Sequence, residues 1–462
     1  MPFDPAAPKA ALAALPAASA IFALYGASER DEPYIGRTPN LRGRLGRLLQ
    51  PSANHPRRLY LAGQVRRIGW RLTGSEFESL LLQFALLDEV YGEKALERMH
   101  LRAPAFVRLY GGNAYPRLAV SNRPSQREAA WAYGPFPSRA SAERYAEETL
   151  KLFLLRRCTD DLAPSPDHPG CVYSEMKKCL APCYRGCSDE RYAEEAAAVQ
   201  EFLSTRGQSR LVALCAERER ASAALEFEAA AAVHAQVQRV EAVQSLAAEI
   251  VRPLDQLRAV ILQASAIPGE VAVFLYENGW LRGPVGFSTL GMRIQNEQSG
   301  STSLFLQPVA IEPVAETVVS EQLSVVSEQC AEKSGQAVSS QLSAFSLTAG
   351  HEGVEEQGRG NREEGKENAT AKVPRGLLEA RFEAVLAALS APSGSPTATE
   401  RQAHLALVKR WYYRPEARRE GEIFFPAAEG GWPVKSILRG IGRVAAKGIK
   451  SSVTHSPDLA QE

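Results

Sequence analysis

Five of the seven cysteines lie in one short stretch, between positions 158 and 187. Four of them follow one another at intervals of 13, 8 and 4 residues: Cys158, Cys171, Cys179 and Cys183. Four soft thiolates at one place suit an iron–sulfur cluster or a zinc ion, and their spacing does not decide between these. Cys187 is an additional thiol that is either a bystander or an alternative ligand, and His168 lies in the same loop as a further alternative ligand. We expect a metal or cluster site here, because clustered cysteines in a cytosolic protein favour metal binding over disulfides.

The segment YIGRTPNLRGRLGRLL, residues 34–49, places one tyrosine ahead of a series of arginines. Nine arginines, and no lysine or acidic residue, occur from Arg37 to Arg71. A solvated surface explains them poorly, because like charges without interspersed acids repel one another. We interpret them as a surface for a phosphate backbone. Apart from Arg37 and Arg44, the arginines expected to contact nucleic acid are Arg42, Arg47, Arg57, Arg58, Arg66 and Arg67.

Composition limits the class of protein. A chain of 462 residues predicts two to four domains. The net charge is only +1, so a nucleic-acid surface has to come from an uneven distribution of charge. No stretch of 18 apolar residues occurs, so we expect no transmembrane helix and no membrane partner. Residues 1–15 lack a basic start and contain prolines, which predicts a loose leader in a cytoplasmic protein.

Patterns of apolar residues predict the elements that position the tyrosine and the arginines. Residues 19–25 and 32–36 have the character of short strands, followed by a helix that Thr38 would cap and a third strand at 64–73. A second helix would begin after Ser75, with one apolar stripe: Phe77, Leu80, Leu81, Phe84 and Leu87. The expected order over residues 16–100 is ββαβα, a small α+β domain.

The remainder predicts a multidomain α+β chain. Expected in turn are a hairpin and helix at 101–157, the cysteine-rich region at 158–187, helices at 188–250 and strands at 251–300. Residues 301–372 have the composition of an acidic, disordered linker. The basic, aromatic-rich region 373–462 leaves two interpretations open: a surface for single-stranded or distorted DNA, or a small folded unit whose aromatics form a core.

The tyrosine–glycine strand, the arginine-bearing helix and the cysteine series together resemble the UvrC-like excinuclease family. The first part resembles its GIY-YIG nuclease domain, which implies Tyr34, Arg44 and Arg37 as catalytic residues and Mg²⁺ or Mn²⁺ as cofactor. The sequence GC…KKCLAPC resembles the family's cysteine-rich region, which implies a [4Fe–4S] cluster on the four cysteines, with Zn²⁺ as the alternative. The resemblance implies nucleotide excision repair, DNA as partner and a single metal-dependent phosphodiester incision.

Two positions depart from this family pattern. Phe22 stands where a tyrosine is expected, and it has no hydroxyl. Gln83 stands where a metal-binding glutamate is expected, and a neutral amide binds Mg²⁺ more weakly than a carboxylate. The alternative is therefore a catalytically impaired, DNA-binding repair accessory, and the sequence leaves open whether this chain is an enzyme.

Residues 224–237, ALEFEAAAAVHAQV, resemble the UVR motif of the same family. The resemblance implies contact with a UvrB-like helicase through Leu225, Phe227, Ala230 and Val237. The alternative is an ordinary helical hairpin packed on its own chain. The resemblance covers residues 16–250. The sequence after residue 250 shows no pattern of the RNase H-like half, so the chain is most similar to the short, Cho-like members of the family.

Overall fold

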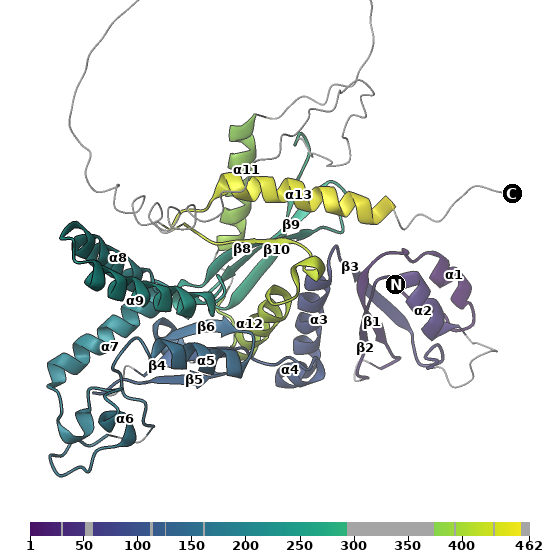
Figure 1. Ribbon diagram of the computed structural model, residues 1–462. Helices are drawn as coiled ribbons and strands as arrows, with labels where there is room; N and C mark the ends of the chain where they lie inside the picture. Colours follow the sequence, from purple (N-terminus) through teal and green to yellow (C-terminus); the bar gives the residue numbers. More distant parts are fainter. Residues whose placement is uncertain are drawn as a thin grey trace, which may run out of the picture. The chain divides into compact units, whose positions relative to one another are not determined.

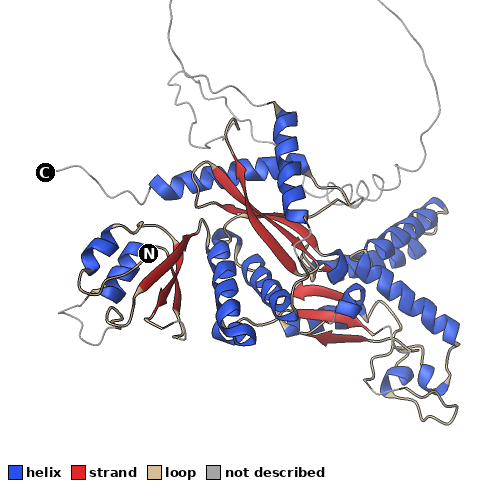
Figure 2. Ribbon diagram, turned by 180° about the vertical axis from the view of Figure 1, so that it is seen from behind, coloured by secondary structure: helices blue, strands red, loops and turns tan. Residues whose placement is uncertain are grey.

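The computed structural model describes residues 1–28, 31–50, 59–110, 114–124, 126–159, 162–292, 374–391, 394–427 and 430–453 (Figure 1). Helices and three antiparallel sheets make up this part of the chain, which confirms a mixed α+β class (Figure 2). Residues 212–237 belong to a separate compact unit from the other described residues. The predicted acidic linker, 301–372, lies outside the described residues.

The N-terminal sheet has the strand order β2-β1-β3, and both pairings are antiparallel. The elements follow one another as ββαβα after a short first helix, as the sequence predicts. Asn40 rather than Thr38 caps the helix after β2, because its side-chain oxygen accepts a hydrogen bond from the Gly43 N–H. The bounds are β1 (Ala20–Tyr25), β2 (Tyr34–Thr38), α2 (Leu41–Leu49), β3 (Arg67–Leu72) and α3 (Glu76–Tyr91).

The first fifteen residues are packed, so the prediction of a loose leader is wrong. They contain a helix, α1 (Pro8–Ala13). Their apolar side chains Phe3, Leu12 and Leu15 are buried in the same core as α2 and β1. The Phe3 N–H also donates to the Arg66 carbonyl at 2.8 Å. Burial of these three side chains outweighs the breaks that the prolines introduce.

Helix α3 has the stripe that its sequence predicts. Ser75 is its N-cap, accepting from the Glu78 N–H at 3.1 Å. The buried side chains include the five predicted apolar residues, spaced three and four apart: Phe77, Leu80, Leu81, Phe84 and Leu87. The helix contacts β1 and β2 and also α12 (Ala398–Tyr412), so it joins the N-terminal sheet to the C-terminal part of the chain. The short elements η1 (Gly92–Lys94) and α4 (Ala95–Arg98) follow it.

A second sheet has the order β5-β4-β6-β7, with α5 (Arg139–Thr149) in contact with it. The predicted tight turn of its first hairpin, residues 111–113, lies outside the described residues. The strands are β4 (Ala105–Leu109), β5 (Leu118–Ser121), β6 (Ala132–Phe136) and β7 (Arg252–Pro253). The η2 segment (Gln126–Trp131) precedes β6 and η4 (Leu254–Gln256) follows β7. The cysteine-rich region and the predicted helices follow α5 as α6 (Val172–Glu175), η3 (Pro182–Tyr184), α7 (Asp189–Ser204), α8 (Gln208–Ala223) and α9 (Phe227–Ser245).

The third sheet contains strands from residues 251–300 and from residues 373–462, which the sequence analysis predicts as two separate regions. Its order is β10-β9-β8-β11, in which β11 (Glu422–Phe424) pairs with β8 (Arg258–Ala264). The other strands are β9 (Glu270–Glu277) and β10 (Trp280–Ser288), and Asn278 and Gly279 between them both have positive φ, as a type I′ turn requires. Helices α11 (Arg375–Ser390) and α13 (Val434–Val453) pack on this sheet.

Candidate nucleic-acid site and cysteine cluster

Tyr34 and Arg44 lie side by side at the N-terminal sheet. Tyr34 begins β2, and Arg44 is on α2, ten residues later. Arg44 Nη2 donates to Tyr34 Oη at 3.5 Å, and both side chains are partly exposed. A guanidinium beside a hydroxyl offers a phosphate one fixed positive charge and several donors in a planar fork.

Phe22 packs against Tyr34 on the same face of the N-terminal sheet. It pairs with Gly36 across β1 and β2, is buried, and its ring centroid is 6.1 Å from that of Tyr34. A Cβ at Gly36 would lie 2.7 Å from Phe22 Cζ, so only glycine leaves room for this ring. The glycine of the YIG sequence is therefore explained by a close contact with the aromatic ring, and Phe22 contributes packing without a hydroxyl.

Arg37 is separated from the other two predicted catalytic residues. Side chains alternate along a strand, so Arg37, three residues after Tyr34 on β2, faces the opposite side of the sheet. Its Nη1 is 3.2 Å from Glu76 Oε1. The structure brings Tyr34 and Arg44 together and places Arg37 in a different group of charges.

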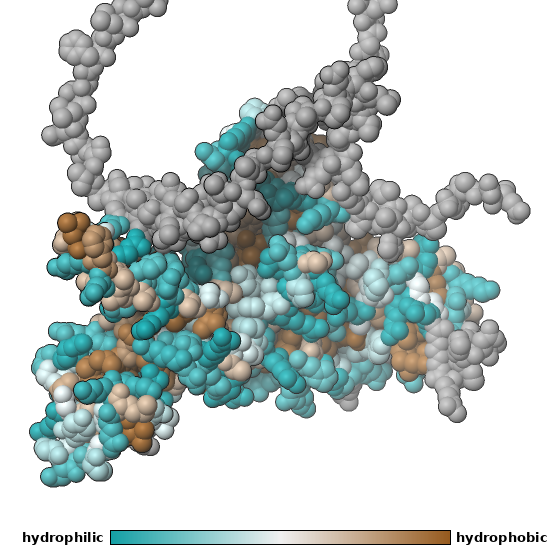
Figure 3. All heavy atoms as spheres, in the orientation of Figure 1, coloured by the Kyte–Doolittle hydropathy of each residue, from teal (hydrophilic) through white to brown (hydrophobic). Residues whose placement is uncertain are grey.

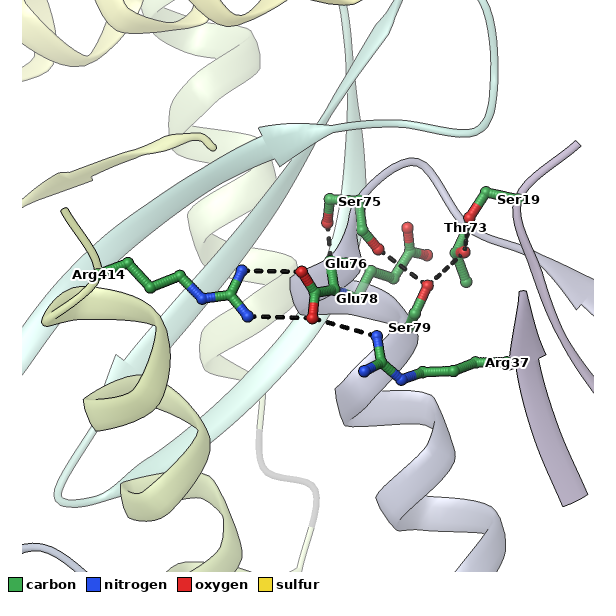
Figure 4. A network of polar contacts seen from close by, with 8 residues as sticks. All are labelled: Ser19, Arg37, Thr73, Ser75, Glu76, Glu78, Ser79 and Arg414. Atoms are coloured by element: carbon green, nitrogen blue, oxygen red, sulfur yellow. Dashed lines mark hydrogen bonds and ion pairs between the residues drawn. The ribbon is translucent and has the colours of Figure 1, made fainter. Parts of the chain in front are cut away.

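Glu76 is held between two arginines (Figure 4). Arg414 Nη1 and Nη2 lie 2.8 and 3.0 Å from its two carboxylate oxygens, and Arg37 is the second partner. Hydrogen bonding from Arg414, together with the charges of both arginines, lowers the pKa of Glu76 from 4.5 to about 2. Sequence reasoning missed Arg414, and no local pattern signals a partner 338 positions away.

A chain of hydroxyl groups fixes the start of α3 beside this ion pair (Figure 4). Thr73 Oγ1 contacts Ser19 Oγ at 3.2 Å and Ser79 Oγ at 2.6 Å, which connects the residue before β1 and the residue after β3 to the first turn of α3. Glu78 accepts from the Gly74 N–H at 2.8 Å, and burial raises the pKa of its carboxyl group. This carboxylate stabilises the beginning of α3, and Gln83 is half-buried further along the same helix.

The other predicted DNA-contacting arginines are distributed over different elements. Arg42 and Arg47 are exposed on α2, and Arg42 Nε donates to the Leu15 carbonyl at 2.7 Å. Arg66 and Arg67 are exposed at the start of β3, where the Arg67 guanidinium lies 4.1 Å from the Tyr25 ring centroid. Arg57 and Arg58 lie outside the described residues. Because Arg67 pairs across the sheet with Tyr25, it lies on the face of Arg37, and Tyr34 lies on the other.

Thiols of the predicted ligand set act through their charge on Cys179 and Cys183, whereas no thiol is among the charges that shift the pKa of Cys187. Burial raises the pKa of Cys179, and the three other thiols of the series raise it further through their charge. Burial likewise raises the pKa of Cys187, but its charged neighbours are Asp189 and Arg191. In the arrangement that the structure shows, the described residues contain no group of three or more His, Cys, Asp or Glu side chains that could hold a metal ion.

The backbone around Cys179 and Cys183 is bent in an unusual way. Lys177, Ala181 and Arg185 have φ values of 52°, 56° and 60°, in the left-handed region that residues other than glycine seldom adopt. Such conformations persist where surrounding structure holds them in place. The Ala181 N–H bonds to the Cys179 sulfur, and Arg156 Nη1 lies 3.6 Å from Cys158 Sγ. Donors aimed at sulfur stabilise the thiolate form, the form in which a cysteine binds a metal or cluster.

The turn between α8 and α9 exposes two apolar side chains. Leu225 is 72% and Phe227 67% exposed, and hydrophobic residues gather at this turn in Figure 3. Ala230 is half-buried and Val237 is 1% exposed. Of the four predicted partner-binding residues, Leu225 and Phe227 are thus the accessible ones.

Comparisons with known proteins match the part of the chain that holds these groups. The model of the UvrC/Cho excinuclease middle domain matches residues 106–202, which include the four cysteines. The UvrABC system protein C of Alcanivorax borkumensis is 30% identical over 46% of this chain and 34% of that protein. The chain is UvrC-like. A second relative of this UvrC-like chain, the UvrABC system protein C of Alkalilimnicola ehrlichii, is 28% identical over 53% of this chain and 40% of that protein.

This UvrC-like chain spans about a third to two fifths of the length of these curated relatives. No solved structure matches it. Within the part of the chain that the structure describes, none of its helices combines the length and the apolar character needed to cross a bilayer.

Proposed function

We propose that this chain acts in nucleotide excision repair as a DNA-binding protein that holds a phosphodiester between Tyr34 and Arg44. The observation that carries the proposal is the contact of Arg44 Nη2 with Tyr34 Oη on an arginine-bearing helix. Likeness to UvrABC system protein C over about half the chain supports the repair role.

Arginines on one helix would bind the phosphate backbone without reading its sequence. Arg44 contributes a planar guanidinium at Tyr34, and Arg47 is exposed one turn further along α2. Each phosphate neutralised releases counter-ions, so affinity should fall steeply as the salt concentration rises. Contacts of this kind position a protein on DNA and leave lesion choice to other parts of the molecule.

Metal-dependent incision at the same place is the second candidate, and the pairing of Tyr34 with Arg44 is what favours it. Among the described residues, the two expected candidates do not offer a divalent metal a free carboxylate there. Gln83 offers an amide, and the Glu76 carboxylate is already neutralised by Arg37 and Arg414. These residues do not fit Mg²⁺ or Mn²⁺ as ligands, so we favour a repair accessory in the GIY-YIG-like domain over an incising enzyme.

A nicking and binding assay on lesion-bearing and undamaged duplexes, with and without Mg²⁺, separates the two candidates. The accessory function predicts binding with a preference for the lesion and no nicking. Arg44→Ala should weaken binding about tenfold or more, the loss expected for one charge-assisted contact. Mg²⁺-dependent nicking that Arg44→Ala abolishes would establish the second candidate. Binding that neither the lesion nor Arg44 affects would overturn the proposed function.

The four cysteines are the proposed ligands of a [4Fe–4S] cluster, with Zn²⁺ as the alternative. The charges that neighbouring thiols exert on Cys179 and Cys183, and the donors aimed at the sulfur atoms of Cys158 and Cys179, support this assignment. Such a group, when bound, would crosslink the four cysteines and stabilise the fold of residues 158–183.

A UvrB-like helicase is the proposed protein partner of the α8–α9 turn. Leu225 occupies a left-handed position, with φ of 61°, after the last turn of α8. Glycine is usual at such a position, and a leucine there holds an apolar side chain outward at a cost of about 1 kcal/mol. Leu225→Asp with Phe227→Asp should abolish capture of the purified helicase. Val212→Asp, at another exposed apolar position on α8, should leave capture intact, and equal capture by both variants would refute the assignment.

A further inference from the structure

Helix α13 carries a cation at every fourth position of its exposed side. The four residues are Lys435, Arg439, Arg443 and Lys447, and all four are exposed. The whole stretch 430–453 contains no aspartate or glutamate. We call these four residues the α13 basic stripe.

The spacing of the stripe aligns its charges on one face. Four residues of α-helix advance about 6 Å, so the stripe spans about 18 Å from first to last. Like charges four residues apart destabilise a helix by a few tenths of a kcal/mol per pair. An anionic partner would offset this repeated unfavourable arrangement, which has no interspersed acids.

The opposite face of α13 is buried in the core of the third sheet. Ile437, Leu438, Ile441 and Val444 are part of that core, and the helix contacts β8 and β9 (Figure 1). At Gly440 an added Cβ would lie 2.5 Å from Phe424 Cζ, so the helix and the sheet are close together. The apolar face is thus unavailable for insertion into a lipid surface, which basic amphipathic helices on membranes require.

Only one member of the stripe is neutralised within the described residues. Arg443 forms a two-bonded ion pair with Glu422 on β11, at 2.7 and 2.6 Å. Lys435, Arg439 and Lys447 make no ion pair with any other residue that the structure describes. Counting only partners among the described residues, three unneutralised cations therefore remain along one face.

Trp411, Phe425 and Trp432 of the C-terminal region do not form a stacking surface beside this stripe. Trp411 and Phe425 are buried, and Trp432 is half-buried beneath the Arg258 guanidinium, 5.5 Å from its ring centroid. The C-terminal region had two interpretations, a DNA surface and a small folded unit. The folded unit explains the aromatic residues, because they are buried or half-buried, but it does not explain the α13 basic stripe.

We propose that the α13 basic stripe is a second nucleic-acid surface, which contacts the phosphate backbone through point charges and does not stack on bases. It does not depend on Tyr34 or Arg44, and it would add a sequence-independent contact to the one proposed at the N-terminal sheet.

The test compares the full chain with the variant Lys435→Gln/Arg439→Gln/Lys447→Gln in equilibrium binding to duplex and to single-stranded DNA over a range of salt concentrations. The matched control, Lys9→Gln/Lys94→Gln/Arg410→Gln, removes three exposed cations from other elements. Circular dichroism and thermal melting of both variants verify that they fold. Anionic phospholipid vesicles serve as a third ligand.

The slope of log affinity against log salt for duplex DNA should become shallower by up to about 2.7 in the stripe variant, since each lost contact removes about 0.9. The control should retain the wild-type slope. Loss of single-strand binding alone would assign the stripe to single strands and still support the proposal. Equal slopes in the two variants, or loss confined to vesicle binding, would overturn it. A normal stripe variant together with a weakened Arg44→Ala would remove only this inference and leave the proposed function standing.

Discussion

Arg414 and Glu76 are 338 positions apart in the chain and form a two-bonded ion pair, with nitrogen–oxygen distances of 2.8 and 3.0 Å. The pair joins the residues just after α12 to the first turn of α3, and Arg37 on β2 completes it. Two arginines from distant parts of the chain thus share the carboxylate of Glu76, and this withdraws both Glu76 and Arg37 from the Tyr34 site.

Stability should depend on this carboxylate at acidic pH. The pKa of Glu76 is about 2 in the folded protein, compared with 4.5 for an ordinary glutamate. A lowered folded pKa contributes stability above pH 4.5, and this contribution is lost as pH falls from 4.5 towards 2. Because the side chain is 39% exposed, we discount the shift for solvent screening and expect about 1 to 2 kcal/mol.

Urea unfolding of wild type and Glu76→Gln between pH 2 and pH 7 measures this contribution. The two proteins should differ most at pH 7 and converge near pH 2. Arg414→Ala should cost a similar amount at pH 7, whereas Arg375→Ala, which breaks an exposed pair within α11, should cost less than 1 kcal/mol. A pH-independent difference between wild type and Glu76→Gln would contradict the assignment.

Gly36 should not tolerate a methyl group. In Gly36→Ala the new Cβ would meet the Phe22 ring at 2.7 Å, and we expect a loss of about 1 to 3 kcal/mol from overpacking. Gly46→Ala is the matched control, because nothing lies within 4 Å of its added Cβ in α2, and it should stabilise by up to about 1 kcal/mol. Thermal melting measures both. Adding Phe22→Leu should restore part of the loss, and a tolerated Gly36→Ala would show that the ring is not held against the glycine.

The four cysteines and Cys187 should behave differently. Serine at Cys158, Cys171, Cys179 or Cys183 should each lower bound metal in anaerobically purified protein, whereas Cys187→Ser should leave the content unchanged. The basis is that other thiols of the set raise the pKa of Cys179 and Cys183 through their charge, while Cys187 has Asp189 and Arg191 as its charged neighbours. Iron and sulfide analysis, zinc analysis and the absorbance spectrum are the measurements. A loss of metal only in Cys187→Ser would contradict the ligand assignment.

Local patterns predicted the elements and not the long-range contacts between them. The stripe of α3 and the Asn278-Gly279 turn are visible in the sequence because each depends on residues within a few positions of one another. The pairing of β11 with β8 and the Arg414–Glu76 ion pair are not visible, because each joins residues more than a hundred positions apart. The packing of residues 1–15 was missed for a related reason: Phe3, Leu12 and Leu15 show no period until α2 offers them a core.

The arginines show the same limit at the site itself. Their number predicts a surface for phosphates, but strand alternation divides them between the face of Tyr34 and the face of Arg37. The proximity of Tyr34 and Arg44 followed from the family resemblance, and the separation of Arg37 became evident only from the register of β1 and β2.

The most direct test of the phosphate site is the affinity for duplex DNA at low ionic strength after charge reversal on α2. Arg44→Glu/Arg47→Glu should lower the affinity at least about tenfold and make its salt dependence shallower. Lys94→Glu/Arg410→Glu, which reverses two exposed charges elsewhere, should change the affinity far less. An α2 variant that folds normally and binds duplex DNA as tightly as this control would contradict the account.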